Sequence, residues 1–436
     1  MALESSRNSV LGQLCETVAL PRMVRVRQSF DPTHIEPDAL PAVVWAQLDR
    51  SEVRDKIRPG MSIAVTCGSR GIANIAVIIK AIVDFVKAQG AYPFVFPAMG
   101  SHGGATAKGQ QEVLKSYHIT EENMGCPIRA TMETVCLGRT EEGRQVFQDK
   151  YAHEADGVIL CGRIKAHTAF RGPYESGLLK MSVIGMGKQH GAQAVHESGF
   201  CNMARVLPQF AKVIFEQTNI IAGIGILENA FEQTYKIAGL TPDEIWEQEP
   251  ALLREAKSKM GRIWVEKADV LVVDKIGKDI SGDGMDPNVT GTFGSPESAC
   301  DGSPGPLKAQ RTVVLDLTDA SHGNANGIGA ADITTKRLVD KTNVDITYPN
   351  AMTSTLVAMV KMPMFAHTDK HAIQLAVRVC NEIDKANPRI IRIENTMQLE
   401  HIWVSEALIP EVEAHPNMEL DGRPEPWSFN EMGNLW

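Results

Sequence analysis

Residues 62–89 read SIAVTCGSRGIANIAVIIKAIVDFVKAQ and join a strand, a glycine turn and a helix in direct succession. Ser62–Cys67 is a short run with β-branched residues, which favours a strand. Gly68–Gly71 supplies the turn, and Ile72–Gln89 carries apolar residues at helical spacing. A strand–turn–helix unit of this kind is typical of an α/β layered fold.

The same alternation continues on both sides of this stretch. We expect strands at 23–28, 92–97, 157–161, 220–226, 269–274, 312–317 and 389–393. We expect helices ending near Tyr117 and spanning 203–217, 241–260, 350–361 and 370–384. The pattern predicts an α/β protein with largely parallel sheets, and a length of 436 residues predicts two domains. We place a first domain at 1–265 and a second at 266–395, with a Gly/Pro-rich loop at 280–307. The tail 396–436 is expected to pack back on the first domain.

Composition excludes several classes of protein. The net charge of −9 and the lack of a basic tract argue against nucleic acid as a partner. The longest apolar stretch, 72–86, is interrupted by Lys80 and Asp84, so no membrane span is expected. The first residues show no secretory signal pattern, and no two cysteines form a C-x-x-C pair. We therefore expect a cytoplasmic globular protein without a zinc-ribbon or iron–sulfur framework.

Polar side chains follow several of the expected strands. Arg70, His102 and His167 each come just after a strand of the first domain, and Lys275 and Lys278 follow the 269–274 strand of the second. Loops at the carboxyl ends of parallel strands share one edge of a sheet, where ligands bind. The sequence therefore predicts an interdomain active-site cleft whose imidazoles and cations suit a small carboxylate undergoing proton chemistry.

Residues 162–200, GRIKAHTAFRGPYESGLLKMSVIGMGKQHGAQAVHESGF, hold a lysine between histidines. Lys180 lies in an apolar run, which suits either a surface lysine with a buried stem or a desolvated amine used for covalent attachment. His190 and His196 follow it, and imidazole is a common metal ligand. His322, in the Gly-rich run SHGNANGIG, is a further residue that could line the cleft.

Together these motifs resemble the nickel-pincer-cofactor-dependent lactate racemase family. The resemblance rests on GSRG, GSHGGAT, KAHTAF, ESGLLKM and the histidine that follows, within residues 65–197, with weaker support from residues 274–291. It implies nickel and a pincer nucleotide, pyridinium-3-thioamide-5-thiocarboxylic acid mononucleotide, covalently bound to a lysine. It also implies that cofactor-biosynthesis enzymes are partners.

The resemblance also implies a role for each matched residue. Lys180 matches the tethering lysine, and His196 matches the nickel ligand in preference to His190. His102 and His167 match the two acid/base histidines. The anion-binding residues that it implies are Arg70, for cofactor or substrate, and Lys275 and Lys278, for substrate.

The implied activity is racemisation or epimerisation of a 2-hydroxy acid. One histidine takes the hydroxyl proton while the α-hydrogen leaves as hydride to the cofactor, and return from the opposite face inverts the centre. Cys67 stands where the family carries an aspartate, and PYESG is inserted before Lys180. The resemblance therefore leaves open which acid is the substrate.

Two other functions compete with this interpretation. An oxidoreductase using a diffusible NAD-type nucleotide would need a G-x-G-x-x-G turn after a strand, which the sequence lacks. A non-catalytic homologue that only binds a small carboxylate would have no need for both histidines and the lysine. Assembly into a homo-oligomer is compatible with either.

Overall fold

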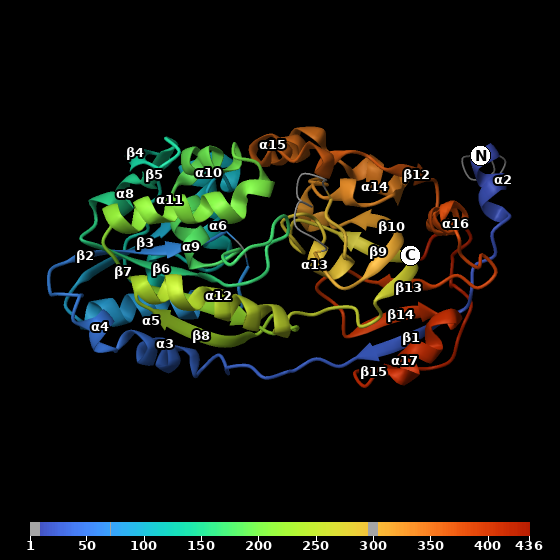
Figure 1. Cartoon of the computed structure of the whole chain (residues 1–436), viewed down its shortest axis with the longest axis horizontal. Helices are drawn as coiled ribbons and strands as arrows, with labels where there is room; N and C mark the ends of the chain where they lie inside the picture. Colours follow the sequence, from blue (N-terminus) through green and yellow to red (C-terminus); the bar gives the residue numbers. More distant parts are fainter. Residues whose placement is uncertain (1–8, 70, 295–303) are drawn as a thin grey trace. The chain divides into compact units, whose positions relative to one another are not determined.

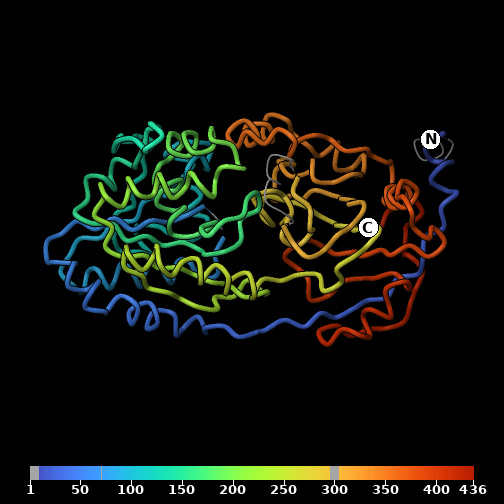
Figure 2. The backbone as a smooth tube through the Cα atoms, viewed as in Figure 1, coloured from blue at the N-terminus to red at the C-terminus, as the bar shows by residue number. Residues whose placement is uncertain are grey.

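The structure is a computed structural model that describes residues 9–69, 71–294 and 304–436. The chain forms two compact units. Unit 1 comprises Met1–Phe30 and Gly261–Trp436, and unit 2 comprises Asp31–Met260. Figure 2 traces the backbone, which leaves unit 1 after residue 30 and returns to it at residue 261. Each unit is built on one main sheet with helices against it, so the α/β class predicted from the sequence is confirmed.

Unit 2 is built around a five-stranded sheet with the order β3-β2-β6-β7-β8. Its strands are β2 (Ser62–Cys67), β3 (Tyr92–Pro97), β6 (Gly157–Arg163), β7 (Ile220–Glu228) and β8 (Thr234–Leu240). The first four strands in this order are parallel, and β8 is antiparallel to β7. A separate hairpin consists of β4 (Thr134–Arg139) and β5 (Gln145–Asp149). The parallel part brings the carboxyl ends of β2, β3 and β6 to one edge.

Helices lie on both sides of this sheet (Figure 1). One face packs against α5, whose apolar stripe includes the fully buried Ile78, Ile79 and Ile82. The helices of unit 2 are α3 (Leu40–Leu48), α4 (Ser51–Arg54), α5 (Ile75–Ala88), α6 (Ala107–Ser116), α7 (Glu121–Met124), α8 (Lys150–Glu154), α9 (Leu178–Lys180), α10 (Lys188–His196), α11 (Met203–Gln217) and α12 (Pro242–Lys259). The predicted capping box of α12 is present, because Thr241 and Glu244 bond each other's backbone N–H groups.

Unit 1 contains an eight-stranded sheet with the order β12-β11-β10-β9-β13-β14-β1-β15. Its strands are β1 (Met23–Gln28), β9 (Lys267–Ile276), β10 (Lys308–Leu317), β11 (Ile333–Thr335), β12 (Met364–Ala366), β13 (Ile390–Ile393), β14 (His401–Ser405) and β15 (Met418–Leu420). The strands from β12 to β13 are parallel, and β14, β1 and β15 continue the sheet antiparallel. The helices of unit 1 are α2 (Val10–Glu16), α13 (Pro287–Thr290), α14 (Lys336–Lys341), α15 (Val344–Ser354), α16 (Asp369–Val379) and α17 (Ile409–Ala414).

The two ends of the chain meet within unit 1. Strand β1 lies between β14 and β15, and Val26 pairs with Ile402 on one side and Leu420 on the other. The structure therefore differs from the expected boundaries, which placed residues 1–30 in the first domain. The tail 396–436, which was expected to pack on the first domain, contributes β14 and β15 to the sheet that contains β1, in the unit formed by residues 1–30 and 261–436.

One expected helix is displaced. The helix expected at 350–361 is instead α15 (Val344–Ser354), followed by a 3-10 turn at Val357–Val360. Asn343 caps the helix by accepting from the N–H of Asp345, so the helix begins six residues earlier. Thr355 has a left-handed φ of +63°, which ends the helix within the expected span.

A charged residue introduced at position 26 tests whether β1 is part of the unit 1 sheet. Val26 has no exposed surface, so Val26→Asp should destabilise unit 1 by about 4 kcal/mol or more, because it buries an unpaired carboxylate. Limited proteolysis read by mass spectrometry should then show cleavage in residues 261–436 before cleavage in residues 31–260. Arg25→Gln, on the exposed face of the same strand, should leave the pattern unchanged. Equal loss of protection in both segments would contradict the assignment of β1 to unit 1.

Candidate active site

The candidate site begins at the carboxyl edge of the unit 2 sheet. Strands β2, β3 and β6 are parallel and end at Cys67, Pro97 and Arg163. The loops that follow them carry Ser69, His102 and His167. Parallel strands present such loops at one edge of the sheet, where open α/β folds bind ligands. Arg70, the predicted anion-binding residue, lies outside the described residues.

The loop after β3 presents His102 in an exposed turn. The Nδ1 atom of His102 is hydrogen-bonded to Oγ of Ser69, which joins the loops after β2 and β3. The hydroxyl of Tyr117 donates to the carbonyl of Ser69 (2.8 Å), so α6 and its following residue help to hold the contact. The turn requires glycine at position 103, where φ is +65° and a Cβ would lie 2.6 Å from the backbone nitrogen of Gln110.

The buried side chain of Lys188 stabilises this turn through its contact with Gln110. Lys188 has no exposed surface, and its ammonium donates to Oε1 of Gln110 (2.8 Å) and to the carbonyl of Pro97, and pairs with Asp149 at 3.1 Å. Gln110 in turn donates to the carbonyls of Gly100 (2.9 Å) and His102 (3.2 Å). The ammonium therefore donates two hydrogen bonds and faces a carboxylate, which compensates for the burial of its charge. The network links the first residue of α10 to the loop that carries His102.

The loop after β6 is closed by a buried carboxylate. Glu175, whose side chain is fully buried, accepts from the backbone N–H groups of His167 (2.7 Å) and Gly172 (3.2 Å). It also pairs with Lys257 (2.6 Å) and Arg171 (3.5 Å), and Arg171 donates to the carbonyl of His167 (2.6 Å). Both backbone polar groups of His167 are thus fixed, which restricts where its ring can point.

The His167 ring contacts the amine of Lys180. Nε2 lies 2.7 Å from Nζ of Lys180, and Nδ1 accepts from the N–H of Ala169 at 2.9 Å. The ring also packs against Phe170, with centroids 4.4 Å apart. Burial, with the nearby positive charges of Lys180, His196 and Arg171, lowers the pKa of His167 well below its usual value. At neutral pH the imidazole is therefore uncharged and able to act as a base.

Lys180 closes a short helix that a second buried glutamate caps. Glu249 of α12 accepts from the N–H of Leu179 at 3.1 Å, and burial raises its pKa to about 7. Gly177 is required here, because a Cβ would lie 2.1 Å from Oε1 of Glu249. A single π-helical segment, Met181–Gly185, follows the lysine. Such segments are frequent at functional sites.

His196 lies close to this pair and His190 does not share its surroundings. His196, in the last turn of α10, stacks on Phe200 (5.3 Å between centroids), and Phe200 also contacts the His167 ring (6.1 Å). His190 is exposed against the β4–β5 hairpin, where its Nδ1 bonds Thr134 (2.9 Å). Of the two alternative metal ligands, the arrangement favours His196.

Lys275 and Lys278 belong to unit 1, whereas the three histidines and Lys180 belong to unit 2. Nζ of Lys275 lies 5.7 Å from the ring centroid of Trp436, and Nζ of Lys278 donates to the carbonyl of Gly282 (2.6 Å). His322, in the same unit, is exposed in a left-handed conformation after β10. The predicted cleft shared by both lysines and the histidines stays a prediction.

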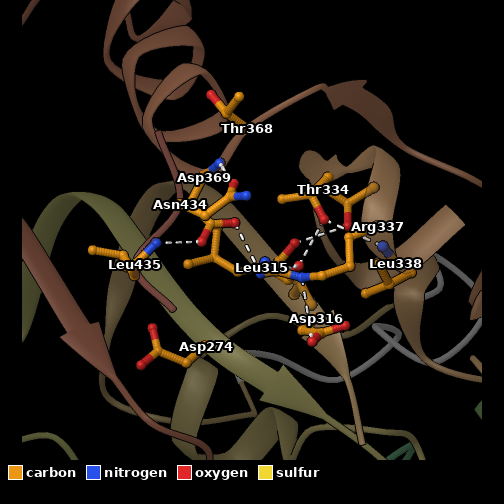
Figure 3. Close-up of polar contacts among 12 residues, drawn as sticks. Asp274, Leu315, Asp316, Thr334, Arg337, Leu338, Thr368, Asp369, Asn434 and Leu435 are labelled. Atoms are coloured by element: carbon orange, nitrogen blue, oxygen red, sulfur yellow. Dashed lines mark hydrogen bonds and ion pairs between the residues drawn. The ribbon is translucent and has the colours of Figure 1, made fainter. Parts of the chain in front are cut away.

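Arg337, Asp316 and Asp369 form an ordered network of charges in unit 1 (Figure 3). Arg337 lies between Asp316 (3.3 Å) and Asp369 (2.9 Å). Asp369 also accepts from the N–H of Leu435 (2.8 Å), and its own N–H donates to Asn434 (3.1 Å). These contacts fasten residues 434–436 beside the carboxyl ends of β9 and β10, so the chain's last residues help to form this edge.

Sequence reasoning missed several residues that build the site. Glu175 stands in the PYESG segment that looked like an insertion. Glu249 lies 70 positions after Leu179, whose N–H it accepts, and on a different helix. Lys188 and Phe200 were passed over as ordinary residues. Only Glu175 carried a signal, because a carboxylate flanked by glycines near a histidine could have been read as a loop anchor.

Two kinds of feature are absent from the described residues, a membrane-spanning helix and a cluster of metal ligands. No described helix has the length and apolar character needed to cross a membrane. Nor do three or more His, Cys, Asp or Glu side chains gather into a metal-binding group anywhere in the described ranges.

The fold and this edge define an α/β protein in which the candidate site lies largely within residues 31–260. Residues 23–206 match the family model of the lactate racemase N-terminal domain. The fold is similar to that of the lactate racemase apoprotein from Thermoanaerobacterium thermosaccharolyticum, with a TM-score of 0.52 and 11% identity, over 86% of this chain and 99% of that one. A comparison with curated proteins found no significant match. Residues 23–206 are thus similar to the N-terminal domain of lactate racemases, and the fold of the chain is similar to that of a lactate racemase.

Ionisation of Glu249 should make stability depend on pH. Its pKa is about 7 in the folded protein and near 4.5 when exposed, so the folded state binds more protons between these values. The free energy of unfolding should therefore fall as the pH rises from about 4.5 to about 7. Glu249→Gln should remove this part of the fall, as measured by urea unfolding across the range. Glu247→Gln, exposed on the same helix, should retain it, and identical profiles for all three proteins would contradict the assignment.

Proposed function

We propose that this protein racemises or epimerises a 2-hydroxy acid with a nickel-pincer nucleotide attached to Lys180. The match of residues 23–206 to the model of the lactate racemase N-terminal domain supports a racemase or epimerase in general terms. The observation that carries the finer proposal is the 2.7 Å contact between Lys180 and His167, which puts an amine and a base side by side at the ligand-binding edge. A diffusible nucleotide cofactor would not require a lysine amine beside a histidine ring, because it forms no covalent bond with the protein.

The residues present fit the proposed group. A covalent tether needs an amine in a partly buried place, and Lys180 provides one. A metal bound beside the tether needs an imidazole nearby. His196 meets this need, because its ring and the His167 ring both contact Phe200. The donor set of this chain is then one imidazole, so the remaining nickel ligands would come from the nucleotide. When bound, that group supplies an acceptor for the substrate's α-hydrogen.

The chain's own part in the reaction is to move protons and to hold the acid. His167 is proposed to act as one of the two acid/base groups at the substrate hydroxyl through Nε2, the ring atom that faces Lys180, once that lysine has been consumed as the tether. His102 serves the opposite face through Nε2, because Ser69 engages its Nδ1. Arg70, Lys275 and Lys278 are proposed to bind the carboxylate or cofactor phosphate as cations.

The proposal extends to the protein's surroundings. A cofactor of this kind has to be made by other enzymes, so we propose cofactor-biosynthesis enzymes as partners and the cytoplasm as the location. Protein for the tests below must therefore come from a host that makes the cofactor.

Nickel content tests His196. His196→Ala should lose bound nickel, because the protein's imidazole ligand is removed. His190→Ala is the matched control on the same helix and should retain it, since His190 faces the β4–β5 hairpin. Metal analysis alongside intact mass would report nickel and the Lys180 adduct independently. Retention of nickel in His196→Ala together with its loss in His190→Ala would reverse the assignment.

Exchange at the α-carbon tests the two acid/base histidines. His102→Ala and His167→Ala should each slow loss of α-deuterium from a labelled 2-hydroxy acid by about 10²–10⁴-fold, the usual contribution of a positioned acid or base. Adduct and nickel should be quantified in each variant, so that a loss of cofactor is not read as a loss of proton transfer. His153→Ala, an exposed histidine on α8, is the control. Wild-type exchange in a loaded His102 or His167 variant would remove that residue from the mechanism.

A further inference from the structure

Lys188 occupies a strained corner of the backbone. It follows Gly187 and is the first residue of α10, with a φ of +54° in the left-handed region. Glycine suits this region better than any residue with a Cβ, so a turn alone would favour glycine here. A strained conformation persists where the surrounding contacts determine it, and such residues cluster at functional sites. The contacts of the Lys188 side chain therefore have to explain why a lysine stands at this corner.

The ion pair of Lys188 with Asp149 does not explain it through stability. Both side chains are without exposed surface, and burial raises the pKa of Asp149 and lowers that of Lys188. Desolvation thus disfavours both charged forms, and apolar residues often replace buried pairs of this kind without loss of stability. What an ammonium does supply is direction, because it can only donate hydrogen bonds.

The ammonium of Lys188 sets the orientation of the Gln110 amide. Because an ammonium can only donate, the atom of Gln110 that lies 2.8 Å from Nζ is the oxygen, Oε1. The amide nitrogen then points the other way and donates to the carbonyls of Gly100 (2.9 Å) and His102 (3.2 Å). Gln110 has no exposed surface, so bulk water does not supply another donor to Oε1. Loss of the ammonium would remove the contact that fixes this orientation.

Three carbonyl groups of the loop after β3 therefore depend on one ammonium. Nζ of Lys188 donates directly to the carbonyl of Pro97, the last residue of β3, and Gln110 reaches the carbonyls of Gly100 and His102. These carbonyls are spread along the loop, so its course from residue 97 to residue 102 is held. A buried carbonyl without a donor is costly, so the loop would have to shift if the ammonium were lost.

Lys188 also belongs to the helix that ends at His196. Helix α10 spans nine residues, Lys188–His196, and is a rigid rod of about 14 Å. The N–H of Gly100 donates to the carbonyl of Gly185 (3.3 Å), three residues before Lys188, so the loop and the chain entering α10 touch at a second point. One end of this helix thus contacts the loop of His102, and the other end carries the candidate metal ligand.

We infer that Lys188 is a positioning residue, which through Gln110 fixes the place of His102 relative to α10 and so to His196. The inference rests on the proposed function and deepens it, because it names the contact that keeps a candidate acid/base group in register with the candidate metal ligand. In this role Lys188 acts through the loop and not by contact with the substrate.

Paired substitutions in the cofactor-loaded, full-length protein test the inference. Lys188→Met with Asp149→Asn removes both buried charges together, so neither is left unpaired, and Asn still caps α8. Racemisation of a 2-hydroxy acid should then show a kcat per loaded molecule about 10–10²-fold lower, with KM changed less than about twofold, because a misplaced acid/base group weakens the transition state and not substrate binding. The exposed pair Lys212→Met with Glu141→Gln is the matched control and should retain the wild-type kcat.

A double-mutant cycle with His102 separates positioning from general damage. If Lys188 acts through His102, the paired substitution should cause no further fall in kcat when it is added to His102→Ala. Gln110→Met leaves Lys188 its contacts with Pro97 and Asp149, should show the same dependence on His102, and replaces the paired variant if that one does not fold. An equal fall in kcat with and without His102, or a wild-type kcat in the variants, would overturn the inference.

Hydrogen–deuterium exchange of the cofactor-free protein gives a readout that needs no activity. Residues 98–106 should exchange faster in the paired variant than in the wild type, because three carbonyls of that loop lose their donors. Residues 220–228 of the buried strand β7 should keep their protection. Unchanged exchange at residues 98–106 would overturn the inference alone, whereas absence of racemase activity in every loaded protein, wild type included, would overturn the proposed function.

Discussion

The candidate site depends on the burial of one carboxylate. Glu175 is fully buried and is compensated by two backbone N–H groups and two cations, all from residues that flank or face the His167 loop. A buried charge with every partner in place fixes geometry, because loss of any one partner leaves the others costly. The same carboxylate thereby sets the backbone of His167, the direction of its ring and the distance from that ring to Lys180. Lys188 similarly stabilises the loop that carries His102, through Gln110. Buried charged side chains therefore support both candidate loops.

The repeating parts of the fold were readable from the sequence and the connecting parts were not. Buried parallel strands such as Ser62–Cys67 and Tyr92–Pro97 appear as short apolar runs with clear turn signals, and the structure has them at the predicted residues. The β4–β5 hairpin and the short strands β11, β12 and β15 gave no such signal, because three to six residues of mixed polarity carry little periodicity. Strand β1 pairs with β14 and β15, which are separated from it by most of the sequence, and local sequence patterns cannot predict such a pairing.

For the site, sequence reasoning found the candidate side chains at the sheet edge and missed the residues that contact and position them. His102, His167 and Lys180 stood out because they follow strands or interrupt an apolar run. Glu249 and Phe200 act through tertiary contacts alone, and nothing beside them in the sequence marks the loops that they support. The direct contact of His167 with Lys180 also required coordinates, since thirteen intervening residues permit many separations.

The position of β1 at the centre of an antiparallel trio has a consequence for how the protein is made. Its neighbours β14 and β15 end at residues 405 and 420, so the ribosome makes both of them long after it has made residues 23–28. The strands of residues 31–260 are all synthesised earlier than β14, so that segment can fold while β1 has no partner strand. During this interval the backbone groups of residues 23–28 and the side chains of Val24 and Val26, which are buried in the folded protein, are exposed to non-native pairing.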